Sequence, residues 1–234
     1  MAMAQQAATG GETVMDQSGP HGRLPTEVPL KKYPEIAFAE GKFDITEIVA
    51  GSDQYWDGPS TVFQGGYSLK TTQHSTDGGG QYGWMAFDGN SESLWKNAED
   101  YDTSGNYDYG YTGIQQRLTD TNSTNHDGDH VIMGSPDALK IAKVTVTCKN
   151  SNRRVVNYSV LGSNSSGTTG WTLLDSGTFT AQDVNTATIS SPISYFKYHA
   201  FVVRSVTASG TRFQINSIDF YGYEEDPPTG DTSV

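Results

Sequence analysis

The chain is poor in the features that mark an exported or membrane-bound protein. It has one cysteine, Cys148, so no disulfide can form within it, although small secreted domains commonly depend on such bonds. It has no apolar leader at its N-terminus and no apolar run long enough to span a membrane. We therefore expect a protein without a signal peptide or membrane insertion that folds in a reducing cytoplasm. Cys148 ends an alternating run of valine and threonine, which predicts a buried, inert thiol.

Basic residues are also scarce. The chain has 15 Lys and Arg against 27 Asp and Glu, a formal net charge of -12. The basic residues are scattered along the sequence, whereas binding to phosphate backbones requires them to be clustered. This composition argues against nucleic acid and against anionic membrane surfaces. It suits a surface that meets neutral polar ligands or divalent cations.

No segment has the periodicity of a convincing helix, and the composition favours strands and turns. The chain contains 26 Gly and 13 Tyr, and short β-branched runs alternate with turn residues. Residues 144–149 and 186–190 are examples, while residues 197–206 are apolar on both faces, as in a central strand. Strands at this spacing predict an all-β fold, an antiparallel β-sandwich.

The last predicted strand contains a break in its alternation. Phe213 and Ile215 share one face, but Ile218 and Phe220 fall on the opposite parity. A bulge near Asn216 would bring all four side chains to the core.

The two ends differ from the middle of the chain. Residues 1–40 contain several prolines and little apolar periodicity, which indicates either a disordered tail or an extended arm that a neighbouring subunit orders. Residues 225–234 form an acidic, proline-containing tail or linker. The predicted sandwich domain spans residues 41–224.

Within that domain, short motifs resemble those of the discoidin-like family, also called factor V/VIII type C or galactose-binding-like domains. They occur in the family's order at residues 86–95 (AFDGNSESLW), 128–133 (GDHVIM), 138–141 (ALKI), 158–164 (YSVLGSN), 171–174 (WTLL), 197–203 (KYHAFVV) and 214–222 (QINSIDFYG). The resemblance implies a jelly-roll-like sandwich that binds glycans, lipids or proteins through loops at one end. Trp95 and Trp171 match core positions of the family.

The resemblance also implies a structural Ca²⁺ beside the Asp-Gly-Asn turn, with Asp88, Asn90 and Ser93 as its ligands. Ca²⁺ prefers six to eight oxygen ligands. The family usually adds a glutamate from the closing strand, and this chain has Ser217 at that position. The alternative is a turn closed by hydrogen bonds to the Asp88 carboxylate.

Ligand contacts are expected from a tyrosine-rich loop. Flat rings suit the C–H faces of sugars, and short polar groups suit their hydroxyls. The candidates in this loop are Tyr101, Asp102, Asn106, Tyr107, Tyr109 and Tyr111, and a second, smaller segment of the same kind offers Tyr55 and Trp56. The alternative is that these aromatic residues pack the loop onto the sandwich or form a subunit contact.

Catalysis is not expected, because the chain lacks a nucleophile elbow and a phosphate-binding glycine loop. Residues 126–130 (HDGDH) match no strong zinc spacing and favour a turn. Residues 30–36 (LKKYPEI) resemble segments of structural proteins from large aquatic DNA viruses and phages. We thus expect a virion-surface module that binds host glycans and contacts other virion subunits through residues 1–40. The alternative is a structural capsid, spike or cement protein.

Overall fold

The protein is all-β in the parts of the chain that the structure describes. The computed structural model describes residues 29–49, 58–72, 81–97, 101–108, 116–181, 183–190, 192, 194–207 and 212–225. Two short 3-10 helices, η1 (Gly83–Phe87) and η3 (Ser151–Arg153), are the helical elements given for these residues, and neither could cross a membrane. The strands are β1 (Lys31–Tyr33), β2 (Asp44–Val49), β3 (Gly58–Gln64), β4 (Tyr67–Thr71), β5 (Trp95–Lys96), β6 (Arg117–Asp120), β7 (Asn125–Asp127), β8 (Asp129–Cys148), β9 (Val155–Ser163), β10 (Thr169–Thr178), β11 (Asp183–Thr188), β12 (Phe196–Val206), β13 (Gln214–Ile215) and β14 (Ser217–Glu224).

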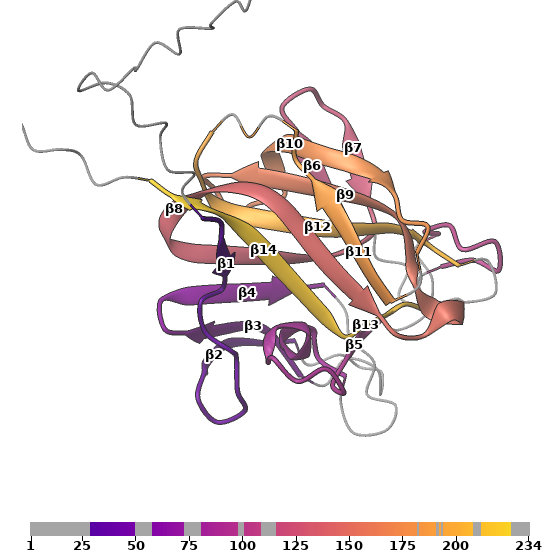
Figure 1. The fold of residues 1–234 in the computed structure, drawn as a ribbon, viewed down its shortest axis with the longest axis horizontal. Helices are drawn as coiled ribbons and strands as arrows, with labels where there is room; N and C mark the ends of the chain where they lie inside the picture. The colour runs from indigo at the N-terminus through magenta and orange to yellow at the C-terminus, as the bar shows by residue number, and fades with distance from the viewer. Residues whose placement is uncertain are drawn as a thin grey trace, which may run out of the picture.

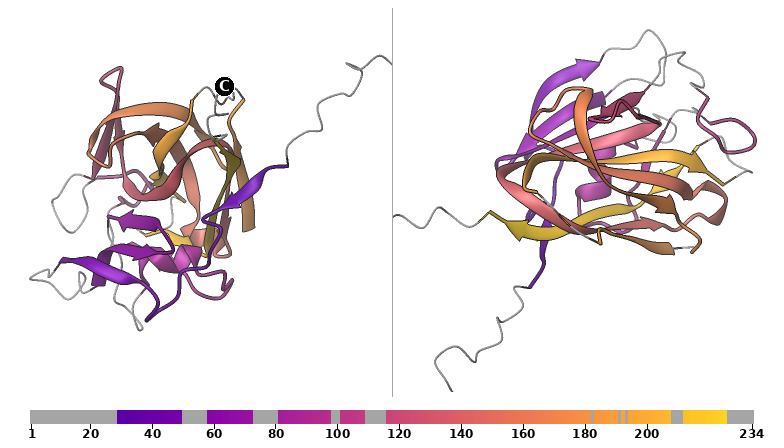
Figure 2. Two further views of the ribbon diagram at one scale, coloured as in Figure 1. Left: turned by 90° about the vertical axis from the view of Figure 1, so that its left-hand side faces the viewer. Right: turned by 90° about the horizontal axis from the view of Figure 1, so that it is seen from above.

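Strand β8 connects the two layers of the sandwich (Figure 1). It is 20 residues long; its first part pairs with β4 and β12, and its last part pairs with β14 and β11. One hydrogen-bonded sheet of 12 strands therefore folds back on itself through β8, and β5 and β13 form a separate pair. The strands curve around a shared centre in both views of Figure 2. The predicted β-sandwich is confirmed, with one parallel pair, β10 with β6, among otherwise antiparallel strands.

Aromatic residues fill the space between the layers. The rings of Tyr158 and Phe179 stack with centroids 4.1 Å apart, and Trp95 meets Phe213 edge to face at 4.8 Å. A second, smaller cluster around Trp171 lies on the other side of β12. Trp95 and Trp171 are both fully buried, so the prediction that they are core residues is confirmed. Because both clusters take residues from β12, this strand is buried on both faces, as its sequence predicted.

The start of the domain differs from the predicted boundary at residue 40. Strand β1 pairs antiparallel with β14, and Tyr33 and Phe38 are fully buried in the main core. The backbone N–H of Phe38 also donates to the carbonyl of Phe87 at 3.0 Å. The prediction that residues 1–40 form one separate arm is therefore wrong for residues 31–39, which are part of the sandwich. The prediction missed Tyr33 and Phe38 because prolines interrupt this segment and leave it too short to show an apolar periodicity. Residues 1–28 and 226–234 lie outside the described residues.

The closing strand breaks where its sequence predicted. Strand β13 pairs with β5 up to Ile215, and β14 pairs with β8 from Ser217 onward. Asn216 lies between them, and its N–H donates to the carbonyl of Thr147 at 2.8 Å. This change of partner brings Phe213, Ile215, Ile218 and Phe220 all to full burial.

The thiol of Cys148 is buried and free, as predicted. Burial raises its pKa to about 11, because the charged thiolate would lose its hydration in the apolar core. A neutral thiol is a poor nucleophile, so Cys148 is a packing residue.

Candidate functional site

The predicted ligand loop is a small hairpin, residues 101–108, held against strand β12. Its first tyrosine, Tyr101, is only 2% exposed, and its hydroxyl donates to the carbonyl of Val203 at 2.7 Å. The ring of Tyr107 packs edge to face on Tyr101 with centroids 5.5 Å apart, and its hydroxyl accepts the N–H of Gln116 at 2.8 Å. A buried ring cannot contact a ligand at the surface. Tyr101 is therefore corrected from a ligand contact to a side chain that attaches the hairpin to the sandwich, and the half-buried Tyr107 supports it.

The polar residues of the hairpin have two different roles. The Asp102 carboxylate accepts the N–H groups of Ser104 and Asn106, each at 2.8 Å, and these bonds close the turn. Asn106 is exposed and forms a β-bridge with Ser205 of β12. Asp102 is thus used within the turn, and Asn106 is the described residue of the predicted set whose side chain is available to a ligand.

Asn106 lies at the rim of a polar groove that crosses β12, β9 and β10. The groove has a volume of about 350 Å³ and is lined by Asn106, Asn157, Ser176, Gly177, Thr178, Arg204 and Ser205. Within it, the hydroxyl of Thr178 donates to the side-chain oxygen of Asn157 at 2.8 Å. Arg204 is exposed and has no carboxylate partner within 4 Å among the described residues.

The lining of this groove offers hydrogen-bond donors and acceptors of the kind that hydroxyl groups require. The planar guanidinium of Arg204 offers several donors in a fixed fork, and the two asparagine amides offer both donors and acceptors. Sequence reasoning missed Arg204 because it lies inside an apolar run. The sequence did contain an indication of Arg204: it is a single charged residue in a strand whose other central residues are buried, and such a charge indicates a position that faces solvent.

The Asp-Gly-Asn turn brings its predicted residues together through hydrogen bonds. The N–H of Asn90 donates to one carboxylate oxygen of Asp88 at 2.7 Å, and the Ser93 hydroxyl donates to the other. The side-chain oxygen of Asn90 accepts the N–H of Glu92 at 3.0 Å. Gly89 has a φ of +73°, a conformation that favours glycine, so the turn depends on it.

A Ca²⁺ ion does not fit these hydrogen bonds well. The side-chain amide of Asn216 donates to the carbonyls of Ser91 and Ser93, at 3.3 and 3.1 Å. Both Asp88 oxygens also accept donors, so N–H and O–H groups lie where a cation would need open oxygens. Ser217 adds no carboxylate; its hydroxyl donates to that of Thr147 at 3.0 Å. These contacts support the alternative of a turn closed by Asp88, and Ca²⁺ binding stays a prediction.

Residues 126–130 lie where β7 ends and β8 begins, with Gly128 as a bend between the two strands, so the turn predicted for the whole segment is limited to Gly128. His126 is buried, with Nδ1 3.0 Å from the Ser159 hydroxyl and Nε2 3.3 Å from an Asp120 oxygen. His130 instead contacts the Gly128 carbonyl through Nδ1 at 3.1 Å, so the two imidazoles have separate partners. Gly128 has a φ of +145°, and a Cβ there would clash with the backbone of β12. The described residues contain no group of three or more His, Cys, Asp or Glu side chains that could hold a metal.

Four other predicted ligand residues, Tyr55, Trp56, Tyr109 and Tyr111, lie outside the described residues. Their part in ligand binding stays a prediction.

Comparison with known proteins finds similar folds among carbohydrate-binding modules. No protein-family model and no curated protein matches the chain. A family 32 CBM of Clostridium perfringens NanJ, solved in complex with galactose, is 17% identical with a TM-score of 0.47 and covers 69% of this chain and 98% of its own. The C-terminal domain of a Bacteroides fragilis chitobiase is 18% identical with a TM-score of 0.49, covering 71% and 99%. A likeness at this level concerns the fold alone.

Proposed function

We propose that this protein is a non-catalytic module that binds neutral glycans in the groove between Asn106 and Arg204. The observation that carries the proposal is the groove itself, whose lining combines an exposed guanidinium that has no carboxylate partner in the described part of the chain with two amides and several hydroxyls. Sugar hydroxyls act as donor and acceptor together, and such mixed polar groups can satisfy them in pairs. The groove volume of about 350 Å³ falls at the lower end of the range of ligand sites, which suits one or two sugar rings.

The rigid walls of the groove support binding over catalysis. Asn106 is held by the closed turn of its hairpin, and the N–H of Asn157 donates to the Ser205 hydroxyl at 3.0 Å. Pre-ordered contact groups reduce the entropy that a ligand must pay on binding. The described residues that line the groove are amides, hydroxyls and one guanidinium, whereas glycoside hydrolysis relies on a pair of carboxylates.

The virion setting is part of the proposal and is supported by the resemblance of residues 30–36 to segments of viral structural proteins. In that setting the module is assembled in the host cytoplasm and recognises glycans on the host surface. Contacts with other virion subunits would then come from residues 1–28, since residues 31–39 pack on their own domain.

The test is a glycan array followed by calorimetric titration of any hit, with and without added Ca²⁺. We expect Arg204→Ala to abolish measurable binding and Arg204→Lys to lose most of it, because lysine keeps the charge but lacks the planar fork. Lys42→Ala, which removes an exposed charge in a distant turn, serves as the control and should bind normally. No binding of any neutral glycan by the wild-type protein at millimolar concentration would refute the proposal.

A further inference from the structure

Two lysines lie on the outer face of one layer of the sandwich, the layer formed by β1, β14, β11 and the last part of β8. The regular alternation of side chains along a strand would place these two lysines on opposite faces. Lys140 and Lys143 are three residues apart on β8, so a regular strand would point them to opposite faces. The pairing with β14 shifts between Tyr221 and Gly222, opposite Lys143 and Ile141, which leaves Ala142 as an extra residue in β8. This bulge leaves Ile141 buried and both lysines partly exposed, on the solvent side.

Gly222 allows this arrangement. A Cβ at Gly222 would lie 2.3 Å from the carbonyl oxygen of Lys140, a distance that no side chain can accept. The bulge therefore requires the extra residue Ala142 on β8 and the glycine Gly222 on β14. The positions of Lys140 and Lys143 depend on this bulge.

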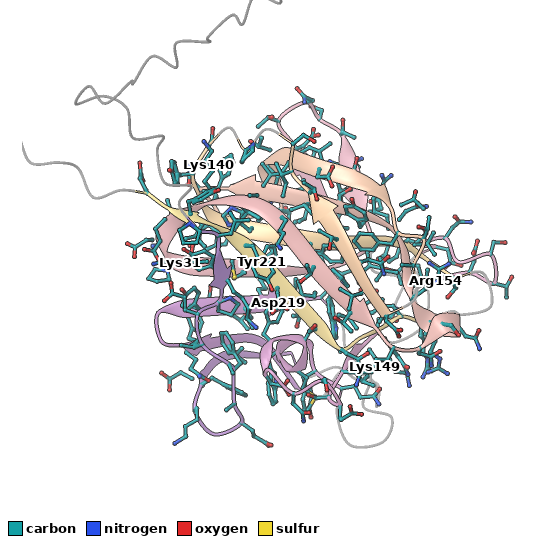
Figure 3. The ribbon with its side chains drawn as sticks, viewed as in Figure 1. Lys31, Lys140, Lys149, Arg154, Asp219 and Tyr221 are labelled. Atoms are coloured by element: carbon teal, nitrogen blue, oxygen red, sulfur yellow. The ribbon has the colours of Figure 1, made fainter. Side chains whose placement is uncertain are left out.

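Tyrosine rings hold both lysines in place. The ammonium group of Lys143 lies 4.4 Å from the ring centroid of Tyr221, and that of Lys140 lies 5.7 Å from the ring centroid of Tyr195. Such contacts are attractive but leave the positive charge in place. Figure 3 shows Lys140 and Tyr221 on the same side of the molecule, together with Lys31 and Asp219.

The two lysines of the neighbouring strand β1 are already neutralised. Lys31 pairs with Glu224 at 3.1 Å, and Lys32 pairs with Asp219 at 2.9 Å. Lys140 and Lys143 have no carboxylate within 4 Å in the part of the chain that the structure describes. A protein with a net charge of -12 thus presents two ordered, unpaired cations beside aromatic rings.

We propose that this lysine–tyrosine face binds an acidic polysaccharide, with Lys140 and Lys143 contacting its carboxylate or sulfate groups. Three residues along a strand separate the two lysines by roughly 10 Å, about the length of a disaccharide. Tyr221 and Tyr195 supply the rings on which a sugar can pack. A nucleic acid carries about one charge per 1.7 Å of duplex and would meet the repulsion of the acidic remainder of the protein. An acidic polysaccharide is a single chain whose charges are separated by sugar rings, so it meets less of that repulsion, which is screened beyond about 8 Å at physiological salt.

Affinity electrophoresis and calorimetry with polygalacturonate, dextran sulfate and neutral dextran test the proposal. We expect wild-type protein to bind polygalacturonate or dextran sulfate, and to bind neutral dextran much more weakly. The double variant Lys140→Gln/Lys143→Gln should weaken binding about tenfold, since two exposed charge pairs are lost. The matched control is Lys42→Gln/Lys70→Gln, which changes the net charge equally at exposed sites away from this face and should bind as wild type.

Three outcomes would overturn the proposal: no binding of either acidic polymer by the wild type, equal losses in the two double variants, or stronger binding to vesicles of anionic lipid than to the acidic polymers. The face uses different strands from the groove of Arg204, so Arg204→Ala should leave polymer binding unchanged. Failure of the neutral-glycan proposal and failure of this one can therefore be told apart.

Discussion

Two of the three buried histidines in the described part of the chain, His130 and His199, should make the protein lose stability in mild acid, and His199 offers the cleaner test. Its side chain is fully buried on β12, between the rings of Phe196 and Phe220, with centroids 6.2 and 6.3 Å away. Among the described residues, neither ring nitrogen makes a hydrogen bond of ordinary geometry. Burial lowers the pKa of His199 to about 3, and it lowers that of His130 to about 4.

The size of the effect follows from linkage. In the unfolded chain each histidine has a pKa near 6.5, whereas in the folded protein both stay neutral until the pH is far lower. Stability is therefore full above pH 6.5 and falls as the pH drops below it, because the unfolded state gains protons that the folded state cannot. At pH 5 each histidine costs about 2 kcal/mol, so the pair costs about 4 kcal/mol between pH 7 and pH 5.

The variant His199→Leu keeps the volume of the side chain and removes its titration. Urea unfolding at pH 7 and pH 5 should show that the loss of unfolding free energy is about 2 kcal/mol smaller in the variant than in the wild type. Ile132→Val, a non-titrating change on the adjacent strand, is the control and should shift stability equally at both values. If the unfolding free energies of His199→Leu and wild type depended on pH identically, burial would not be what keeps His199 neutral in the folded protein.

Two further predictions concern the N-terminal segment and the thiol. Phe38→Ala should lower the unfolding free energy by about 3 to 5 kcal/mol, because it empties a fully buried aromatic site. Leu30→Ala, at a 37% exposed position, should change the unfolding free energy little. Urea unfolding of both variants checks this, and equal small effects would mean that the segment is not part of the core. Cys148 should resist a thiol reagent such as DTNB at pH 8 in the folded protein, since burial raises its pKa to about 11, and should react once urea unfolds the protein. Rapid labelling of the native state would contradict the burial of this thiol.

The fold was largely predictable because its signals are local. The change of parity between Ile215 and Ile218 is visible in four apolar residues, and only a break in the strand can place all four in the core. The double-sided burial of β12 follows in the same way from the apolar run at residues 200–203. The position of Phe38 was not predictable, since a lone aromatic residue after a proline has no periodicity to report its burial.

The site was less predictable because its residues are sorted by distant contacts. Tyr101 and Asn106 occupy the same polar, tyrosine-rich segment, and both suit a sugar-binding loop. The carbonyl that takes the Tyr101 hydroxyl belongs to Val203, 102 positions along the chain, so nothing near Tyr101 marks it as a buried anchor. The same strand places Arg204 beside Asn106 in the groove. The attachment of the hairpin to β12 therefore buries Tyr101, which was predicted to contact a ligand, and brings Arg204, which was not predicted, to the groove.

Charge distribution shows why composition alone is a weak guide to partners. In the sequence the basic residues look scattered, and an acidic total argues against anionic ligands. In the fold, one extra residue in β8 moves Lys140 and Lys143 to the same face, and tyrosine rings rather than carboxylates hold them there. A charge held by a ring remains available to an anion, whereas a charge held by a carboxylate, such as that of Lys32, is already satisfied. Which anions an acidic protein can bind thus depends on how its few lysines are held, and at β8 a single bulge decides it.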